Sequence, residues 1–302
     1  MYNTIQQVLE NNLNIKLKVF YFTLEMTKEQ KMLSAFANIL YVKEGIRISP
    51  TDLKSTKADK ILPDHILNVI KKYEEYFNKI EEIVEFIDDV RHPTGIYNIV
   101  KKYALANGKI HYRELNIDGE IIQVEDYYEA NDPEEYVIVM IDHIGLISPE
   151  KRNGVQLNLH ESITALSSDY LIKLRNRFGY IPVVIQQQAQ SQESVENKKH
   201  NKLKPSLDGL GDNKLTQRDA DIILGLFSPF RHEIPDYMGY DVRFFKDNIR
   251  FLEILGGRDG GGGTTCPLYF DGAVNYFKEL PLPNESSKMS QVHQIINHIR
   301  KN

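Results

Sequence analysis

The sequence has little cysteine, no long apolar run and little net charge, and each shortage excludes a class of protein. Its single cysteine, Cys266, rules out an intrachain disulfide and a cysteine zinc cluster and fits a reducing compartment. No apolar run approaches the roughly 20 residues needed to span a bilayer, and the first residues are too polar for a signal peptide. We therefore expect a cytoplasmic protein that does not bind membranes. The net charge of −5 gives no sign of nucleic-acid binding, so any DNA surface must be local or built by assembling subunits.

Segments with strand character alternate with segments of helical periodicity along the 302 residues. This alternation predicts an α/β fold with a mostly parallel sheet flanked by helices. The expected strands are 18–24, 84–88, 136–142, 180–185, 220–227 and 249–255, followed by a closing hairpin over 267–277. The expected helices are 2–13, 28–43, 64–82, 94–106, 156–178 and 290–300.

Residues 107–131 interrupt this alternation. Two β-prone runs flank the dipeptide Asp118-Gly119, which is a strong signal for a β-hairpin. We interpret the segment as a hairpin inserted into the α/β framework. It is either surface decoration or an arm that binds a partner, since such loops can carry function.

The most informative stretch is 136–147, an apolar run that contains one acid, Asp142. Its β-prone residues show no polar alternation, which predicts a strand buried on both faces. Asp142 stands where the run breaks, and open α/β sheets bind ligands at the carboxyl ends of their strands. An ionised carboxylate in apolar surroundings needs a partner charge or a metal. We expect Asp142 to order Mg²⁺ through water beside a nucleoside triphosphate; the alternative is an aspartate that makes a turn or cap.

Two further strands end in polar groups suited to phosphate chemistry. Glu25 follows the strand 18–24, and Gln188 closes a run of glutamines after 180–185. Triphosphate hydrolysis needs a metal-holding acid, a base for the attacking water and a neutral donor near the γ-phosphate. We expect Glu25, Asp142 and Gln188 to meet at one sheet edge. Each of them alone could equally be a cap or a surface polar residue.

Five segments, taken in order, resemble the RecA-type motor domain of the DnaB-like replicative DNA helicases of bacteria and phages. They are similar to that family's strand-to-helix motif, Walker B strand, sensor-glutamine strand, acid-flanked strand and arginine-finger segment. The segments are Phe22–Gln30, Ile138–Leu146, Ile181–Gln188, Asp219–Leu224 and Glu253–Gly260, the last running on to Phe270–Gly272. Their order and rough spacing agree over residues 1–277. No single motif is decisive, but five in order argue against chance.

The resemblance implies a role for each matched residue and implies ATP and Mg²⁺ as cofactors. Glu25 would polarise the attacking water, Asp142 would hold Mg²⁺ through its water shell, and Gln188 would contact the γ-phosphate. Arg258 would reach the phosphates of a neighbouring subunit as an arginine finger. The implied assembly is a homo-oligomer, a hexameric ring on single-stranded DNA, with a primase or a helicase loader as a further partner.

Two loops would line the central channel of such a ring, 149–155 and 191–214. The residues that the resemblance places on single-stranded DNA are Lys151, Arg152, Lys198, Lys199, Lys202, Lys204, Gly211, Asp212, Asn213 and Lys214. The basic side chains would meet the DNA backbone electrostatically, while main-chain groups of the second loop would grip it. The alternative for the lysines is a solvated loop face.

The sequence departs from the family in two places. It contains no Gly-x-x-x-x-Gly-Lys-[Ser/Thr], and the glycine-rich turn 256–263 is no substitute because it follows a late strand and does not open a helix. The residues after Met1 look like the continuation of the helix that follows this phosphate loop. We therefore expect the chain to begin just past the loop and, alone, to bind and hydrolyse ATP poorly. Gly256 also stands where the family has a lysine, two positions before Arg258, which makes the arginine-finger role weaker.

The expected organisation is a RecA-like motor domain over 1–280, then a linker and a C-terminal helix over 281–302. The expected function is that of an ATP-dependent replicative DNA helicase motor that translocates on single-stranded DNA as a ring, with hydrolysis at subunit interfaces. Two alternatives stay open. One is a non-catalytic RecA-like ring or partner-binding protein, and the other is a recombinase or packaging ATPase with the same core.

Overall fold

A computed structural model of the chain divides into two compact units. The residues that it describes are 1–11, 15–54, 61–188, 194, 196–197, 203–210, 214–258, 260 and 262–300. The first unit comprises Met1–Ala35 and Leu62–Gln187, and the second comprises Phe36–Ile61 and Gln188–Asn302. Each unit is considered by itself below, and the predicted boundary after residue 280 stays a prediction.

The first unit is built on a four-stranded sheet in the order β2-β1-β5-β8, with every neighbouring pair parallel. The strands are β1 (Lys16–Thr23), β2 (Val84–Ile87), β5 (Glu135–Asp142) and β8 (Ile181–Val184). No residue of β5 from Val137 onward is exposed, as expected of an inner strand that is covered on both faces. The parallel α/β architecture predicted from the sequence is therefore confirmed.

Helices cover the sheet of the first unit. They are α1 (Tyr2–Glu10), α4 (Asp64–Lys72), α5 (Glu74–Ile83), α6 (Pro93–Ala106), α7 (Leu159–Thr164), a π-helical segment (Ala165–Leu171) and α8 (Ile172–Phe178). Side chains of α6 and of the helix 159–178 pack with Phe20, Phe22 and the buried residues of β5 in one core. The single helix expected over 64–82 was wrong. It breaks at Tyr73, whose φ of −100° and ψ of 11° leave the helical region.

Helix α2 (Lys28–Glu44) begins just after Glu25 and runs from the first unit into the second. A capping box fixes its first turn: Thr27 N donates to Gln30 Oε1 at 2.9 Å, and Gln30 N donates to Thr27 Oγ1 at 3.3 Å. Lys28 N also donates to Asp88 Oδ2 at 3.0 Å, just beyond β2. These bonds hold the start of α2 at the carboxyl edge of the sheet.

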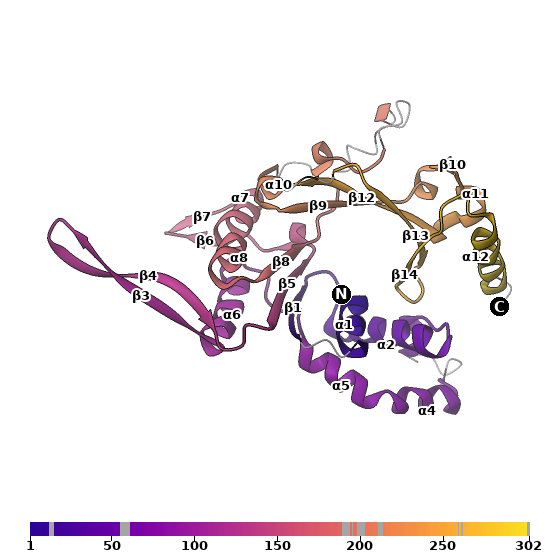
Figure 1. Ribbon diagram of the computed structural model, residues 1–302, viewed down its shortest axis with the longest axis horizontal. Coiled ribbons are helices and arrows are strands. Elements are labelled where there is room, and N and C mark those ends of the chain that lie inside the picture. Colours follow the sequence, from indigo (N-terminus) through magenta and orange to yellow (C-terminus); the bar gives the residue numbers. More distant parts are fainter. Residues whose placement is uncertain are drawn as a thin grey trace. The chain divides into compact units, whose positions relative to one another are not determined.

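The predicted hairpin insertion is present as β3 (Gly108–Ile117) and β4 (Glu120–Ala130), which pair antiparallel. Asp118 and Gly119 form the turn, with φ of 53° and 90°, as a two-residue hairpin connection requires. The ribbon extends beyond the rest of the first unit (Figure 1). Its base is anchored by Tyr128, whose hydroxyl donates to Ala104 O at 2.9 Å and whose ring meets that of Phe178 edge-on. The insertion is an anchored arm.

The second unit contains an antiparallel sheet in the order β14-β13-β12-β9. Its strands are β9 (Ile222–Phe227), β12 (Ile249–Gly257), β13 (Thr265–Asp271) and β14 (Tyr276–Glu279), so the predicted closing hairpin is confirmed. Helix α12 (Ser286–Ile299) contributes Met289 and Ile296 to the same core as Phe227 and Phe251. The shorter elements of this unit are α3 (Pro50–Leu53), α10 (Lys214–Asp219), α11 (Val242–Phe245), β10 (Asp236–Tyr237) and β11 (Tyr240–Asp241).

Candidate functional site

Glu25 and Asp142 lie at the same edge of the first unit's sheet. β1 and β5 are parallel neighbours with Thr23 opposite Asp142, and Leu24 N donates to Asp142 O at 2.8 Å. Glu25 follows directly, so the two acids leave adjacent strands at nearly the same level. The Glu25 side chain is exposed and makes no hydrogen bond or ion pair within the described residues. It is therefore open to water and to a ligand.

Asp142, by contrast, is engaged by two side chains of its own unit. Its Oδ2 accepts hydrogen bonds from Lys31 Nζ and from the Tyr21 hydroxyl, each at 2.7 Å. Lys31 Nζ also donates to the Tyr21 hydroxyl at 3.1 Å and lies 5.0 Å from the centre of its ring. The Lys31 and Asp142 side chains are only 14% and 17% exposed. The carboxylate thus has a cationic partner within the protein, which offsets the cost of burying its charge.

This environment controls the pKa of Asp142. Burial alone would raise the pKa of this carboxyl. The hydrogen bonds from Lys31 and Tyr21, together with the positive charges of Lys31 and His143, outweigh burial, and the pKa lies below its ordinary value. Asp142 is therefore ionised at neutral pH, as a group that holds a cation must be.

The lowered pKa predicts how stability depends on pH. Because the folded-state pKa of Asp142 lies below its unfolded value, the pair stabilises the fold above about pH 4. That contribution is lost as pH falls through the folded-state pKa. The free energy of unfolding of the wild type should exceed that of Asp142→Asn by about 1 kcal/mol at pH 6, a modest amount because solvent screens the pair in part.

The measurement is urea unfolding of both proteins between pH 6 and pH 3, and the difference between them should shrink toward the acid end. Asp89→Asn, which alters an exposed acid just after β2, is the control and should give a flat difference. A difference between wild type and Asp142→Asn that grows on acidification would contradict the assigned pairing.

Lys31 and Tyr21 were not among the residues predicted for the site. Strand alternation could have indicated Tyr21, because it shares a face of β1 with Thr23, the residue opposite Asp142. Lys31 could not be found in this way. Its approach to Asp142 depends on the direction in which α2 leaves the sheet, and no local sequence pattern specifies that direction.

The residues at this edge are compatible with Mg²⁺. This ion is commonly held by one or two carboxylates together with water and substrate phosphates, and Asp142 supplies one. Across the part of the chain that the structure describes, no group of three or more His, Cys, Asp or Glu side chains could hold a metal, so water and nucleotide would complete the shell. Asp142 Oδ1 accepts no hydrogen bond from the described residues. A hydrated ion could meet that oxygen, and Lys31 on Oδ2 would oppose it.

Gln188 and Arg258 belong to the second unit. Gln188 is exposed and follows the end of β8 at Val184. Arg258 lies just after β12, where its Nε is 3.3 Å from Asp221 Oδ1 and its Nη2 donates to Arg218 O at 3.1 Å. The Arg258 side chain is 51% exposed. The convergence of Gln188 with the two acids on one polyphosphate stays a prediction, as does the finger role of Arg258.

The loop expected over 149–155 folds into a small hairpin of β6 (Lys151–Arg152) and β7 (Val155–Gln156). Arg152 forms an ion pair with Asp169 and lies 5.9 Å from the Tyr170 ring centre. Lys204 Nζ is 3.3 Å from Glu253 Oε1, so two of the predicted DNA-binding cations have partners within the chain. Lys151 is exposed and forms no ion pair within the described residues. Lys198, Lys199, Lys202, Gly211, Asp212, Asn213 and the side chain of Lys214 lie outside what the structure describes.

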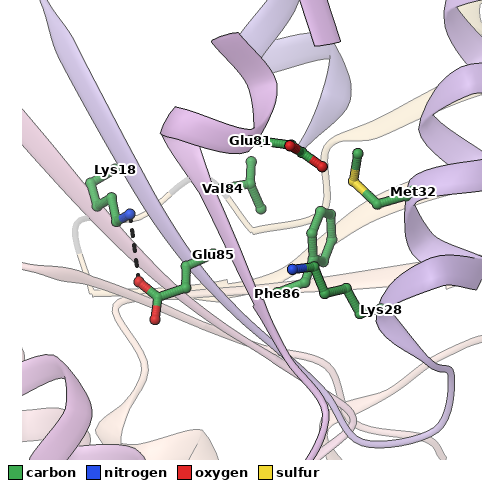
Figure 2. A pocket seen from close by; sticks show the side chains of 7 residues that line it. All are labelled: Lys18, Lys28, Met32, Glu81, Val84, Glu85 and Phe86. Carbon is green, nitrogen blue, oxygen red and sulfur yellow. Dashed lines mark ion pairs between the residues drawn. The ribbon is translucent and has the colours of Figure 1, made fainter. Parts of the chain in front are cut away.

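A cavity of about 320 Å³ lies beside the edge strand of the first unit. Figure 2 shows its lining of Lys18, Lys28, Met32, Glu81, Val84, Glu85 and Phe86. Lys18 and Glu85 form an ion pair at 3.5 Å across one side of it. None of the candidate catalytic residues lines this cavity, so we assign it no part in phosphate chemistry.

Comparison with known proteins gives likeness in structure alone. No protein-family model and no curated protein matches the chain. A solved structure of a DnaB-like replicative helicase, described with its interactions with primase, is similar at 18% identity and a TM-score of 0.61, covering 92% of this chain and 55% of that one. A second solved structure, an isolated ATPase domain, is similar at 18% identity and a TM-score of 0.57, covering 93% of this chain and 79% of that one. This chain thus spans about half the length of the first structure, and it has the α/β, RecA-like fold of the ATPase domains of DnaB-like helicases.

Proposed function

We propose that this chain is the motor domain of a DnaB-like replicative DNA helicase that translocates on single-stranded DNA as a homo-oligomeric ring. The observation that carries the proposal is the pair of acids at one edge of a RecA-like sheet, with Thr23 opposite Asp142 and Glu25 just beyond. Hydrolysis of ATP needs a base for water and an acid for Mg²⁺ at one place. These two residues supply both.

The two acids differ in the way that their proposed roles demand. Glu25 is exposed and would orient the attacking water. Asp142 is kept ionised by its surroundings and would order Mg²⁺, which supplies charge neutralisation on the phosphates when bound. Gln188 would contact the γ-phosphate of ATP.

Hydrolysis at subunit interfaces is proposed from Arg258. Its guanidinium is half exposed and tethered to its own unit by Asp221, so it could exchange that partner for a neighbour's phosphates. A hexameric ring would place each Arg258 beside the next subunit's site. The similar helicase structure is described with primase, and a primase or a loader is the proposed further partner here.

A forked-duplex assay tests the proposal. With ATP and Mg²⁺ the protein should release the labelled strand of a fork that carries single-stranded tails, and it should leave a blunt duplex intact. Because the printed sequence contains no phosphate-binding loop, both the 302-residue chain and any longer product of the same reading frame should be assayed. We expect the chain alone to turn over ATP slowly. Strand exchange or DNA uptake in place of strand release would favour the recombinase or the packaging ATPase.

The second candidate is a non-catalytic RecA-like protein that forms a ring or binds a partner. The Lys31–Asp142 pair favours it, because an internal ammonium already satisfies the acid that would otherwise order a metal. This candidate predicts a stable oligomer in light scattering but no ATP binding and no turnover from any product of the reading frame.

A further inference from the structure

The contact between Lys31 and Asp142 is unusual for an acid proposed to order a metal. The ammonium lies 2.7 Å from Oδ2, and the Tyr21 hydroxyl donates to the same oxygen at 2.7 Å while accepting from Lys31 at 3.1 Å. Three polar groups thus close around one carboxylate oxygen. Both charged side chains are more than four-fifths buried, so solvent screens their attraction only in part.

Rigid elements deliver the ammonium to this position. The capping box of Thr27 and Gln30 fixes the turn of α2 that contains Lys31, and the bond from Lys28 N to Asp88 fixes the direction of that turn. Tyr21 projects from β1, a strand paired on both sides. The pair is therefore part of the folded unit and does not depend on a loose surface side chain.

Two cations at one carboxylate compete. An opposite charge within a few ångströms changes the proton affinity of a carboxylate by about one to three pKa units, which is tenfold to a thousandfold. A divalent ion that approaches Asp142 meets a carboxylate neutralised in the same way and is also repelled by the ammonium. Affinity for the ion should therefore depend on where the Lys31 side chain lies.

We propose that Lys31 is a resident counter-ion that holds Asp142 when no nucleotide is bound, and that a divalent cation takes up Asp142 only when the lysine side chain moves away. Lys31 is thus a positioning residue that lowers the metal affinity of the nucleotide-free site. Its long, flexible stem allows the movement without a change in α2. The inference rests on the proposed function in one respect, that Asp142 is the metal-holding acid.

Binding of Mn²⁺ alone, followed by the electron paramagnetic resonance signal of the free ion, tests this directly. Lys31→Met should bind Mn²⁺ at least about tenfold more tightly than the unaltered chain. The gain should vanish in the double variant Lys31→Met/Asp142→Asn. Lys28→Met removes the same charge from the same helix one turn earlier and should leave Mn²⁺ affinity within about twofold. Lys31→Arg should bind Mn²⁺ as weakly as the unaltered chain.

A second measurement uses the unaltered protein, so that it does not depend on how Lys31→Met folds. In ¹⁵N NMR of the lysine ammonium groups, the Lys31 signal should move on addition of Mg²⁺, and the Lys28 signal should not. A Lys31 signal that stays unchanged while Mg²⁺ shifts the amides around Asp142 would overturn the inference. Equal Mn²⁺ affinity of Lys31→Met and Lys28→Met would overturn it too.

The outcomes separate this inference from the function on which it rests. If Asp142→Asn leaves Mn²⁺ binding unchanged in both the unaltered and the Lys31→Met background, Asp142 is not the metal-holding acid, and the proposed function loses its support along with the inference. If Asp142→Asn abolishes binding but Lys31→Met does not tighten it, the function stands and the competition is refuted.

Discussion

Replacing Glu25 by glutamine should lower DNA-stimulated ATP turnover about 100-fold to 10,000-fold, the usual contribution of a positioned general base. The carboxylate follows β1 at the level of Asp142 and is exposed, so it can reach a water molecule at the sheet edge. Glutamine keeps the shape of the side chain but cannot take a proton. Nucleotide affinity should change little, because the loss falls on the chemical step. The measurement is steady-state phosphate release with and without single-stranded DNA.

Glu29→Gln is the matched control. Glu29 is an exposed acid in the first turn of the same helix, and its neutralisation should leave turnover within about twofold of the wild type. A Glu25→Gln protein that retains wild-type turnover would show that another group activates the water. A Glu25→Gln protein whose ATP affinity falls as much as its turnover would assign Glu25 to binding and not to catalysis.

The strands of the site edge could be predicted because their signals are local. The apolar run that ends in Asp142 identifies a covered inner strand, and the dipeptide Asp118-Gly119 identifies the hairpin turn. The capping box at Thr27 marks the start of α2 with similar clarity. In each case the pattern lies within a few residues and reflects backbone preference or burial. Such patterns predict elements and their ends well.

The partners of the charged side chains could not be predicted in the same way. Lys31 meets Asp142 across 111 positions of sequence, and Arg152 meets Asp169 only because a π-helical segment presents that acid. Both contacts depend on where helices leave the sheet, which periodicity does not encode. The break at Tyr73 was missed for a related reason: the apolar stripe continues through it, and only the backbone turns. The sequence thus indicated which groups could react but not which of them are already paired.

Replacing Arg258 by alanine should lower turnover about 1,000-fold, the lower end of the effect of an arginine finger. The low end is expected for two reasons: Asp221 holds the guanidinium at 3.3 Å and must release it, and Gly256 supplies no second cation. Stability should change by no more than about 1 kcal/mol, because this ion pair is half exposed. Arg243→Ala, which removes an exposed arginine of the same unit that is paired with Asp236 and Asp241, should leave turnover unchanged.

A mixing experiment decides whether Arg258 acts on its own subunit or on a neighbour. Glu25→Gln chains retain Arg258, and Arg258→Ala chains retain Glu25, so each protein alone should be nearly inactive. If the finger acts across an interface, a mixed ring contains interfaces at which an intact Glu25 meets an intact Arg258 from the next subunit. Equimolar mixing should then restore a substantial fraction of wild-type turnover. If Arg258 serves its own subunit, every site in the mixture lacks one of the two groups. Turnover would then stay at the level of the separate variants, and hydrolysis at subunit interfaces would have to be abandoned.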